Sequence, residues 1–554
     1  MLNIYIFRIS FLGIICLSLL HCKTKKNTQE GKEEATLIPL TKAERNFGNE
    51  LAPSIQGIFD QMDTTGTLLL ADDLKIKSSD YISEIYQSNG YQPFWMADSG
   101  LNARGHELMN FFEGSQSIGL NNSFYQVSKL MTLTDSTLTE LGEKEKFSRM
   151  ANVDIAMTYS FLLAGKHLHS GILNEHYASV NYKFDSIQRI FGIELIKSLK
   201  DNHVGEALSK AEPQIPHYQR LKEALVKFVA ATDLQPNDLK IRDYKTDSIG
   251  SLKDVCKALI WHRYLPNGTT IEDSATFYTA FKKFQRDNHL KDDGIPGENT
   301  CYALTVDNYD KFQSIILNLD RWRHMNKTKW PTEYIFVDIP KFELWYIKND
   351  SLERKHNVVV GKTNTQTPDI ESKLENIVLL PSWSVPQSII KKEMMGRIKA
   401  GTLRGYKVTR HKNGWLSVVQ PPGKGNSLGV IKFNFKNDHA VYIHDTPSKS
   451  LFSNDYRAYS HGCVRLKDPV DFGAFILTKQ SNDTISGDSL RTIINKGNSK
   501  QIQITKDIPV FLKYFTAIVD YENKLVVLKD IYKKDEKYID ALFVNYDASW
   551  VKKR

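Results

Sequence analysis

A cysteine between a glycine and a nearby arginine is the strongest chemical signal in this sequence. Cys463 lies within the motif Ser460-His461-Gly462-Cys463-Val464-Arg465, and a further histidine, His444, stands nineteen positions before it. A free thiol has a pKa of roughly 8.5 and is mostly protonated at neutral pH, so a nucleophilic cysteine needs a base or a neighbouring cation. The pattern therefore predicts an activated cysteine for acyl transfer.

Two histidines are candidates for the base. His461 is only two residues from Cys463, whereas His444 follows the strand-like run 440–443. Alternation along that run places Tyr442 and His444 on one side. A histidine at the end of a strand, facing a cysteine on a loop, has suitable geometry for a general base. We therefore expect His444 to be the base and His461 to support the motif.

The rest of the motif fits the same chemistry. Gly462 permits a tight turn and lets backbone N–H groups approach a developing oxyanion. Arg465 can hold a thiolate or bind a substrate carboxylate. Zinc binding by Cys463 and the two histidines is an alternative, but no fourth ligand has a standard spacing. A structural cysteine is the other alternative. No metal or cofactor is expected.

The elements that must position this motif are short strands. From Tyr334 the hydrophobic period becomes strand-like, which predicts a mostly antiparallel β catalytic domain over residues 334–500. A basic insertion at about 386–414 interrupts it, and Glu393 is its one acidic residue. We interpret the insertion as a lid, with a solvated surface excursion as the alternative. Its cations are Lys391, Lys392, Arg397, Lys399, Arg404, Lys407, Arg410 and Lys412.

Helical patterns precede this domain. Residues 51–240 are predicted to form a helical scaffold, in which Pro53 suits the first turn of a helix. Residues 246–308 are predicted to form a separate three-helix module, with its aromatic side chains on one helix face. The connecting helix is predicted over 309–333 and a C-terminal extension over 501–554. The aromatic side chains are Phe277, Phe281 and Phe284.

The N-terminus is read as an export signal. An apolar run of about a dozen residues ends at Cys22, and residues 1–22 resemble a bacterial lipoprotein signal in which that cysteine is lipidated. Ordinary cleavage and an uncleaved anchor are the alternatives. Residues 23–50 are predicted to be a disordered tether. Further along, Cys256 and Cys301 either pair or are small buried side chains.

The amino-acid composition excludes few classes of protein. The chain has 554 residues, 41% of them hydrophobic and 25% charged, which suits a globular protein of several domains. Its net charge of +9 is mild over this length, and no arginine-rich run indicates a nucleic-acid partner.

The residues around the motif resemble the L,D-transpeptidase family, in its large multidomain type. His444, fifteen intervening residues and then the cysteine motif follow the family's catalytic pattern. The segments 358–362, 366–368, 381–386, 419–423 and 444–447 are also similar. That type has a helical scaffold, a peptidoglycan-binding module and a catalytic β domain with a capping insertion. The fold class that the resemblance implies is therefore multidomain α+β.

The resemblance implies a peptidoglycan L,D-transpeptidase of cell wall biogenesis. Cys463 would attack a peptide stem and form an acyl-enzyme, and the amine of a second stem would then complete a 3→3 cross-link. Alternatives are an L,D-carboxypeptidase, a protein-to-peptidoglycan ligase and a non-catalytic peptidoglycan-binding lipoprotein. The partners would be peptide stems, glycan and, through Cys22, a membrane, in the periplasm of a bacterial cell envelope. Candidate substrate-binding residues are Tyr442, Trp383, Lys391, Arg397 and Arg404.

Overall fold

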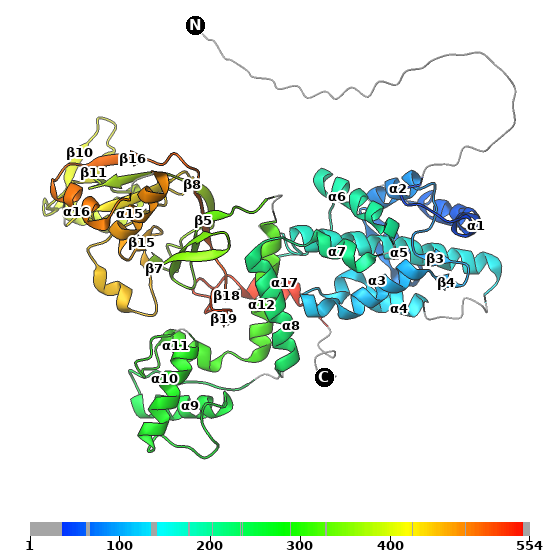
Figure 1. Ribbon diagram of the computed structural model, residues 1–554, viewed down its shortest axis with the longest axis horizontal. Coiled ribbons are helices and arrows are strands. Elements are labelled where there is room, and N and C mark those ends of the chain that lie inside the picture. Colours follow the sequence, from blue (N-terminus) through cyan, green and yellow to red (C-terminus); the bar gives the residue numbers. More distant parts are fainter. Residues whose placement is uncertain are drawn as a thin grey trace, which may run out of the picture.

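The computed structural model describes residues 36–546, apart from 63–66, 135–140, 175–177, 202, 233, 235–236, 289, 327–328, 424 and 482–483. A helical region, a three-helix module and a β domain are arranged around a central helix (Figure 1), which confirms the multidomain α+β class. The signal predicted over 1–22, with Cys22, lies outside the described residues, as do residues 23–35 of the predicted tether. None of the helices described is both long and apolar enough to cross a bilayer.

The helical region is a bundle around one long helix, α5 (Glu143–Ser170), in which every side chain from Met150 to Leu168 is buried. Because α5 is buried on all sides, the other helices must surround it. They are α1 (Lys42–Phe59), α2 (Ser79–Ser88), α3 (Ala103–Gly114), α4 (Val127–Thr134), α6 (Ser186–Lys197), α7 (Val204–Ala211) and α8 (Pro216–Ala231), with the hairpins β1 (Thr67–Leu69)–β2 (Lys75–Lys77) and β3 (Met96–Ala97)–β4 (Gly100–Leu101).

The predicted N-terminal boundary was wrong. Helix α1 begins at Lys42, so the tether does not extend to residue 50, and Pro53 lies inside the helix rather than in its first turn. The start is fixed by a capping box, in which Thr41 Oγ1 accepts from the N–H of Glu44 at 3.2 Å. The Glu44 carboxylate in turn accepts from the N–H of Thr41 at 2.8 Å.

Three helices form a small unit within the range 246–308. Its helices are α9 (Ser248–Trp261), α10 (Ser274–Asp287) and α11 (Glu298–Thr305), and they enclose a small core of their own that includes the three phenylalanines of α10. Cys256 and Cys301 are free thiols, so no disulfide joins them.

The central helix, α12 (Asn308–His324), lies between the bundle and the β domain (Figure 1). It ends nine residues before the predicted end at 333, where strand β5 begins instead. Trp322 stacks on Phe515 with ring centroids 4.1 Å apart. Alternate residues of β5 serve two cores, since Phe336 packs toward the helical bundle and Ile335 packs inside the β domain. The helical bundle and the outer face of β5 therefore share one core, while the inner face of β5 belongs to the separate core of the β domain.

The β domain is a ten-stranded, mostly antiparallel sheet in the order β12-β13-β15-β7-β6-β5-β17-β8-β16, with β14 beside β7. Because β12 also pairs with β8, the path closes on itself. The strands are β5 (Glu333–Asp338), β6 (Glu343–Lys348), β7 (Ser351–Gly361), β8 (Ile370–Leu379), β12 (Ile431–Phe435), β13 (Ile443–His444), β14 (Ala458–Ser460), β15 (Val464–Leu466), β16 (Lys500–Gln503) and β17 (Pro509–Lys513), followed by the hairpin β18 (Ala517–Val519)–β19 (Leu525–Val527). Helices of the domain are α15 (Pro469–Gln480) and α16 (Gly487–Asn495), whereas α17 (Glu536–Leu542) packs against α12 and the core of the bundle.

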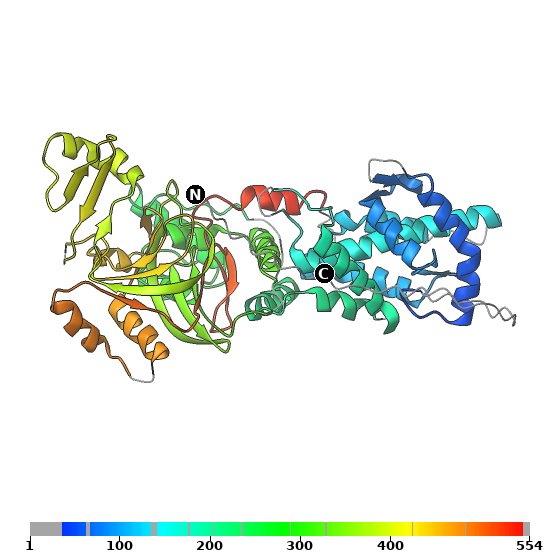
Figure 2. The same cartoon turned by 90° about the horizontal axis from the view of Figure 1, so that it is seen from above.

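Two predicted boundaries of this domain need correction. Strands β16 and β17 belong to the sheet, so it continues to Lys513 rather than ending at 500. The insertion is the capping segment 383–420, longer than the predicted 386–414, and in yellow-green it projects from the sheet (Figure 2). It has a separate small core. Its elements are β9 (Trp383–Ser384), α13 (Gln387–Ile389), a π-helical turn (Ile390–Met394), α14 (Met395–Lys399), β10 (Lys407–Arg410) and β11 (Leu416–Gln420).

Candidate active site

Two adjacent parallel strands bring the predicted nucleophile and base together. Cys463 lies in the turn between β14 and β15, directly before Val464. Strand β15 pairs with β13, so that Val464 is opposite Ile443 and Arg465 is opposite His444. The N–H of Val464 also donates to the carbonyl of Tyr442 at 3.1 Å. The closed sheet thus places two segments about twenty residues apart at one site.

The thiol of Cys463 is half-buried, and its pKa lies above the ordinary value because burial outweighs the neighbouring groups that favour the thiolate. Burial raises its pKa, while hydrogen bonds from the backbone and hydroxyl of Tyr442, and the charges of Lys432 and Arg465, lower it. Lys432 lies opposite His444 on β12, and its Nζ is 3.8 Å from the ring centre of Tyr442. The site can therefore stabilise a thiolate once it forms.

His444 is held as a neutral imidazole. Its side chain is buried, and Nδ1 contacts the carbonyl oxygen of Asp445. Because a carbonyl can only accept, Nδ1 carries the proton in the neutral ring. Burial, followed by the charge of Arg465, lowers the pKa of His444 to about 3. The ring is therefore uncharged at neutral pH.

Cys463 and His444 are neighbours without a hydrogen bond between them in the described structure. The Sγ of Cys463 lies 3.9 Å from the carbonyl oxygen of Ala440. Tyr442 contacts both, since its hydroxyl hydrogen-bonds the thiol and its ring centroid lies 5.5 Å from that of His444. Catalytic hydrogen bonds are often long in substrate-free enzymes and tighten when substrate binds. The arrangement is that of a resting site.

Ser460 stabilises the nucleophile turn, which is the turn at 461–463 that carries Cys463. Its hydroxyl accepts from the N–H of Gly462 at 3.1 Å and donates to the carbonyl of Cys463 at 2.5 Å. Gly462 has a φ of 115°, in the left-handed region that favours glycine. The bond to Ser460 occupies the N–H of Gly462, so the predicted oxyanion-hole role for that group does not fit this geometry.

A second network of hydrogen bonds, which is buried, stabilises the same turn. The hydroxyl of Thr367 donates to the carbonyl of Gly462 at 2.8 Å and accepts from the N–H of Gly361 at 2.9 Å. The hydroxyl of Tyr532 donates to the carbonyl of Gly361 at 2.7 Å and accepts from the N–H of Thr367 at 3.1 Å. Tyr532 and Thr367 are both buried. The C-terminal segment thus helps to position the nucleophile.

His461 points to the capping segment. Its Nε2 lies 2.6 Å from Oε1 of Glu393, which is in the π-helical turn. Single π turns within helices are frequent at functional sites. His461 therefore joins the motif to the capping segment, and His444 is the histidine beside the nucleophile.

The predicted substrate-binding residues separate into two groups. Tyr442 lies at the thiol, and Trp383, half-buried on β9, hydrogen-bonds Tyr442. Lys391, Arg397 and Arg404 are exposed on the capping segment, and no ion pair joins them to an acidic residue of the described chain. Within the described residues, no group of three histidine, cysteine or acidic side chains is arranged to hold a metal ion.

Sequence reasoning did not identify Lys432, Thr367 or Tyr532 as contributors to the site. Lys432 lies in an ordinary strand pattern, and only the strand register places it opposite His444. Thr367 was among the residues that carried the family resemblance, but without a role. Tyr532 lies 69 positions after Cys463, so no spacing along the chain could have indicated its contact.

Comparison with known families identifies this part of the chain. Residues 332–483 match the L,D-transpeptidase catalytic domain, and residues 80–225 match a scaffold domain. Residues 332–483 are an L,D-transpeptidase catalytic domain. Cys463, His444, Lys432 and the capping segment all lie inside the matched range. The range ends before β16 and β17, which complete the sheet of the L,D-transpeptidase domain in this chain.

A curated protein of Haemophilus influenzae, described as a candidate L,D-transpeptidase, is 30% identical over 282 residues. The match covers 46% of this chain and 56% of that protein, so the chain spans about half the length of this relative. Two solved structures are also similar. The L,D-transpeptidase of Stackebrandtia nassauensis is 14% identical, with 51% of this chain and 97% of that chain covered and a TM-score of 0.19. The one of Mycobacterium smegmatis is 14% identical, with 33% and 58% covered and a TM-score of 0.18. Scores this low add nothing to the family match.

Proposed function

We propose that this protein is a peptidoglycan L,D-transpeptidase that forms 3→3 cross-links between peptide stems through an acyl-enzyme on Cys463. The observation that carries the proposal is the environment of that thiol within an L,D-transpeptidase domain. Tyr442 donates hydrogen bonds to it, and Lys432 and Arg465 place positive charge beside it. Such surroundings suit a thiol that ionises during attack rather than before it.

The first half-reaction transfers an acyl group to Cys463. Its Sγ attacks the carbonyl carbon of the third stem residue while the thiol proton passes to Nε2 of His444. The tetrahedral intermediate collapses, the C–N bond to the terminal D-alanine breaks, and the leaving amine takes the proton from His444. Because burial keeps the pKa of His444 at about 3, its protonated form is a strong acid and returns the proton readily.

The second half-reaction passes the acyl group to an amine. The side-chain amine of another stem attacks the thioester, forms an amide and restores the thiol of Cys463. Water as acceptor would make the enzyme an L,D-carboxypeptidase, and a protein amine would make it a protein-to-peptidoglycan ligase. These reactions share the same catalytic residues, so only the products distinguish them.

The capping segment supports a role in holding substrate. Stems carry free carboxylates, and eight cations against one acid raise the local concentration of anions. Lys391, Arg397 and Arg404 have exposed side chains on this segment, and its contact with His461 places it beside the nucleophile turn. A closed segment would also exclude water from the acyl-enzyme.

The deciding experiment uses purified tetrapeptide muropeptides and mass spectrometry. The wild-type protein is expected to form cross-linked dimers, which Cys463→Ala and His444→Ala should not form. Cys301→Ala removes another free thiol, far from the motif in sequence, and should retain activity. Tripeptides without dimers would indicate carboxypeptidase activity. Unchanged muropeptides with every protein would leave a non-catalytic wall-binding lipoprotein and would contradict both enzyme proposals.

We also propose that the protein works in the periplasm, attached to a membrane by lipid on Cys22, and that the module at 246–308 binds peptidoglycan. The lipoprotein-like signal in the sequence supports the first point, and the three-helix fold supports the second. Incorporation of labelled fatty acid that is lost in Cys22→Ser tests the anchor. Co-sedimentation with insoluble peptidoglycan, compared with a chain lacking 246–308, tests the module.

A further inference from the structure

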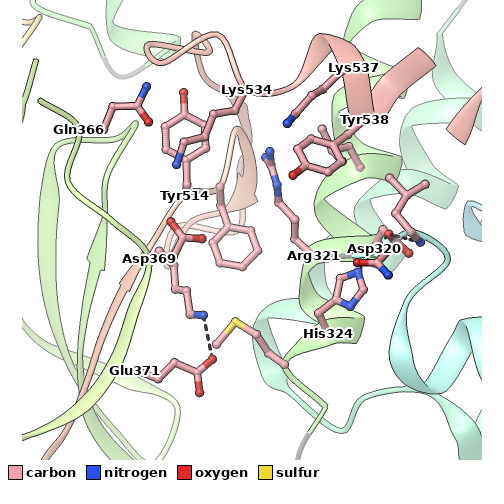
Figure 3. A pocket seen from close by; sticks show the side chains of 16 residues that line it. Asp320, Arg321, His324, Gln366, Asp369, Glu371, Tyr514, Lys534, Lys537 and Tyr538 are labelled. Atoms are coloured by element: carbon pink, nitrogen blue, oxygen red, sulfur yellow. Dashed lines mark hydrogen bonds and ion pairs between the residues drawn. The ribbon is translucent and has the colours of Figure 1, made fainter. Parts of the chain in front are cut away.

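A cavity of about 690 Å³, lined by both polar and apolar side chains, lies between the central helix and the β domain. Its walls come from α12, the loop around 366–371 and the C-terminal segment 513–538, and none of its lining residues belongs to the motif at 460–465. Figure 3 shows charged and aromatic side chains from these three segments directed into one space. A cavity of this size is in the usual range for small-molecule sites.

Some charges in this cavity already have partners within the protein. Lys513 pairs with Glu371 at 2.8 Å, and Arg321 pairs with Asp535 at 2.6 Å. Asp320 accepts from the N–H of Leu173 at 3.2 Å. These groups join the segments that line the cavity to one another, and this structural role explains why charged side chains occur at these positions.

Three other charges, on the half-buried Lys534 and on the exposed Lys537 and Asp369, have no direct partner of this kind. Within the described residues, no hydrogen bond or ion pair joins Lys534, Lys537 or Asp369 to another group. The Nζ of Lys534 lies 4.8 Å from the ring centre of Tyr514, and that of Lys537 lies 4.9 Å from the ring centre of Tyr538. Both ammonium groups therefore lie beside aromatic rings, and the carboxylates whose charge acts on Lys534 are those of Asp369, Asp530 and Asp535.

The environment of Lys534 favours an anion. This lysine is half-buried, and the loss of water around it lowers the pKa of its ammonium group, an effect that the charge of Asp369 opposes. An ammonium group that is partly removed from water is stabilised by negative charge, and a bound anion would add to the charge that Asp369 supplies. Asp369 adds a negative charge to the same cavity, so a ligand with charges of both signs suits it better than a polyanion.

We propose that this cavity binds a peptide carrying both a free carboxylate and a free ammonium group. Lys534 and Lys537 bind the carboxylate, Asp369 binds the ammonium group, and the rings of Tyr514 and Phe515 contact the apolar part. The inference rests on the proposed function, because the peptide stems of peptidoglycan are zwitterions of this kind. It assigns the enzyme a second stem-binding site apart from Cys463.

The cavity lies next to the segments that hold the turn carrying Cys463. Gln366 lines the cavity and directly precedes Thr367, which holds the carbonyl of Gly462. Tyr514 also lines it, and its hydroxyl accepts from the N–H of Tyr532 at 2.9 Å. A stem in the cavity therefore contacts the two segments that hold the nucleophile turn.

Binding is measured by calorimetry with a synthetic tetrapeptide stem in the Cys463→Ala background, which prevents acylation. Lys534→Ala combined with Lys537→Ala is expected to weaken one binding event roughly tenfold, and a stem with its C-terminal carboxylate amidated should lose a similar factor. Lys524→Ala, on an exposed turn next to Glu522, is the matched control and should leave binding unchanged. Lys534→Met keeps the apolar part of the side chain over Tyr514, and it replaces the alanine variant if that protein does not fold.

A photoreactive stem shows where binding occurs. Cross-links to residues 513–538 that disappear in Lys534→Met support the proposal. Cross-links confined to residues around 442–465, with affinity unchanged by the lysine variants, would overturn it, as would equal weakening in Lys524→Ala. The muropeptide assay tests the reaction separately, since stem binding in the cavity does not require acylation of Cys463.

Discussion

The carboxylate of Glu393 lies 2.6 Å from Nε2 of His461, so a polar contact ties the capping segment to the nucleophile motif. The pair is ionic only while the imidazole is protonated. Both side chains are partly exposed, and exposed ion pairs contribute about 0–1 kcal/mol. A contact this weak can open and close readily, which suits the mobile cover that the proposed function requires.

Glu393→Gln tests whether this contact helps to close the capping segment. Loss of the charge should raise the KM for the stem by up to about fivefold, in line with a weak ion pair. Alkylation of Cys463 by iodoacetamide should become faster, because the thiol is less covered. Glu375→Gln, on the exposed side of β8, is the control. Unchanged KM and alkylation in Glu393→Gln would show that the contact has no part in closure.

Tyr532→Phe tests the network behind the nucleophile turn. The change leaves the carbonyl of Gly361 and the N–H of Thr367 without their buried partner, which should lower the free energy of unfolding by about 1–3 kcal/mol. Because Thr367 holds Gly462, kcat should fall roughly tenfold while KM changes little. Tyr278→Phe, in the three-helix module, is the control. A loss of stability with normal kcat would mean that Tyr532 supports the fold alone.

Tyr442→Phe should shift the ionisation of the nucleophile. The hydroxyl of Tyr442 hydrogen-bonds the thiol of Cys463 and lowers its pKa, so removing it should raise that pKa. The midpoint of the pH dependence of Cys463 alkylation should then move to higher pH, and acylation by substrate at pH 7 should slow. Tyr459→Phe, on the exposed side of β14, should leave the midpoint in place. An unchanged midpoint in Tyr442→Phe would contradict the assigned contact.

Acid should destabilise the protein through its buried histidines. Burial lowers the pKa of His167, His217 and His444 to about 3 each, below the ordinary value of 6.5. Below about pH 6.5 the unfolded chain therefore binds protons that the folded chain does not. The free energy of unfolding should therefore decrease as the pH is lowered, by at most about 1.4 kcal/mol per pH unit for each histidine.

Thermal unfolding between pH 7.5 and pH 5 measures this effect. His217→Phe should unfold with a shallower pH dependence than the wild type, since it removes one such group and keeps a ring against Trp322. His439→Ala, at an exposed position, should follow the wild-type slope. Equal slopes for all three proteins would contradict a neutral, buried His217.

The sequence by itself determined the features that depend on residue type and short spacing. Alternation in the strands indicated a β domain, three phenylalanines on one helix face indicated the three-helix module, and Gly462 before Cys463 indicated a tight turn. Each of these signals is local, because neighbouring positions on one strand, helix or turn are fixed by backbone geometry alone. The assignment of Cys463 as nucleophile and of His444 as base rests on the same kind of local signal and stays a prediction.

Only the tertiary structure decided which groups surround them. Closure of the sheet placed Lys432 opposite His444, folding of the C-terminal segment brought Tyr532 to Gly361, and the capping segment delivered Glu393 to His461. Domain limits at 42, 324 and 513 were likewise set by packing and strand pairing rather than by composition. Hydrogen bonds, burial and the pKa values that follow from them depend on distance in space, and residues far apart in the chain acquire that proximity only on folding.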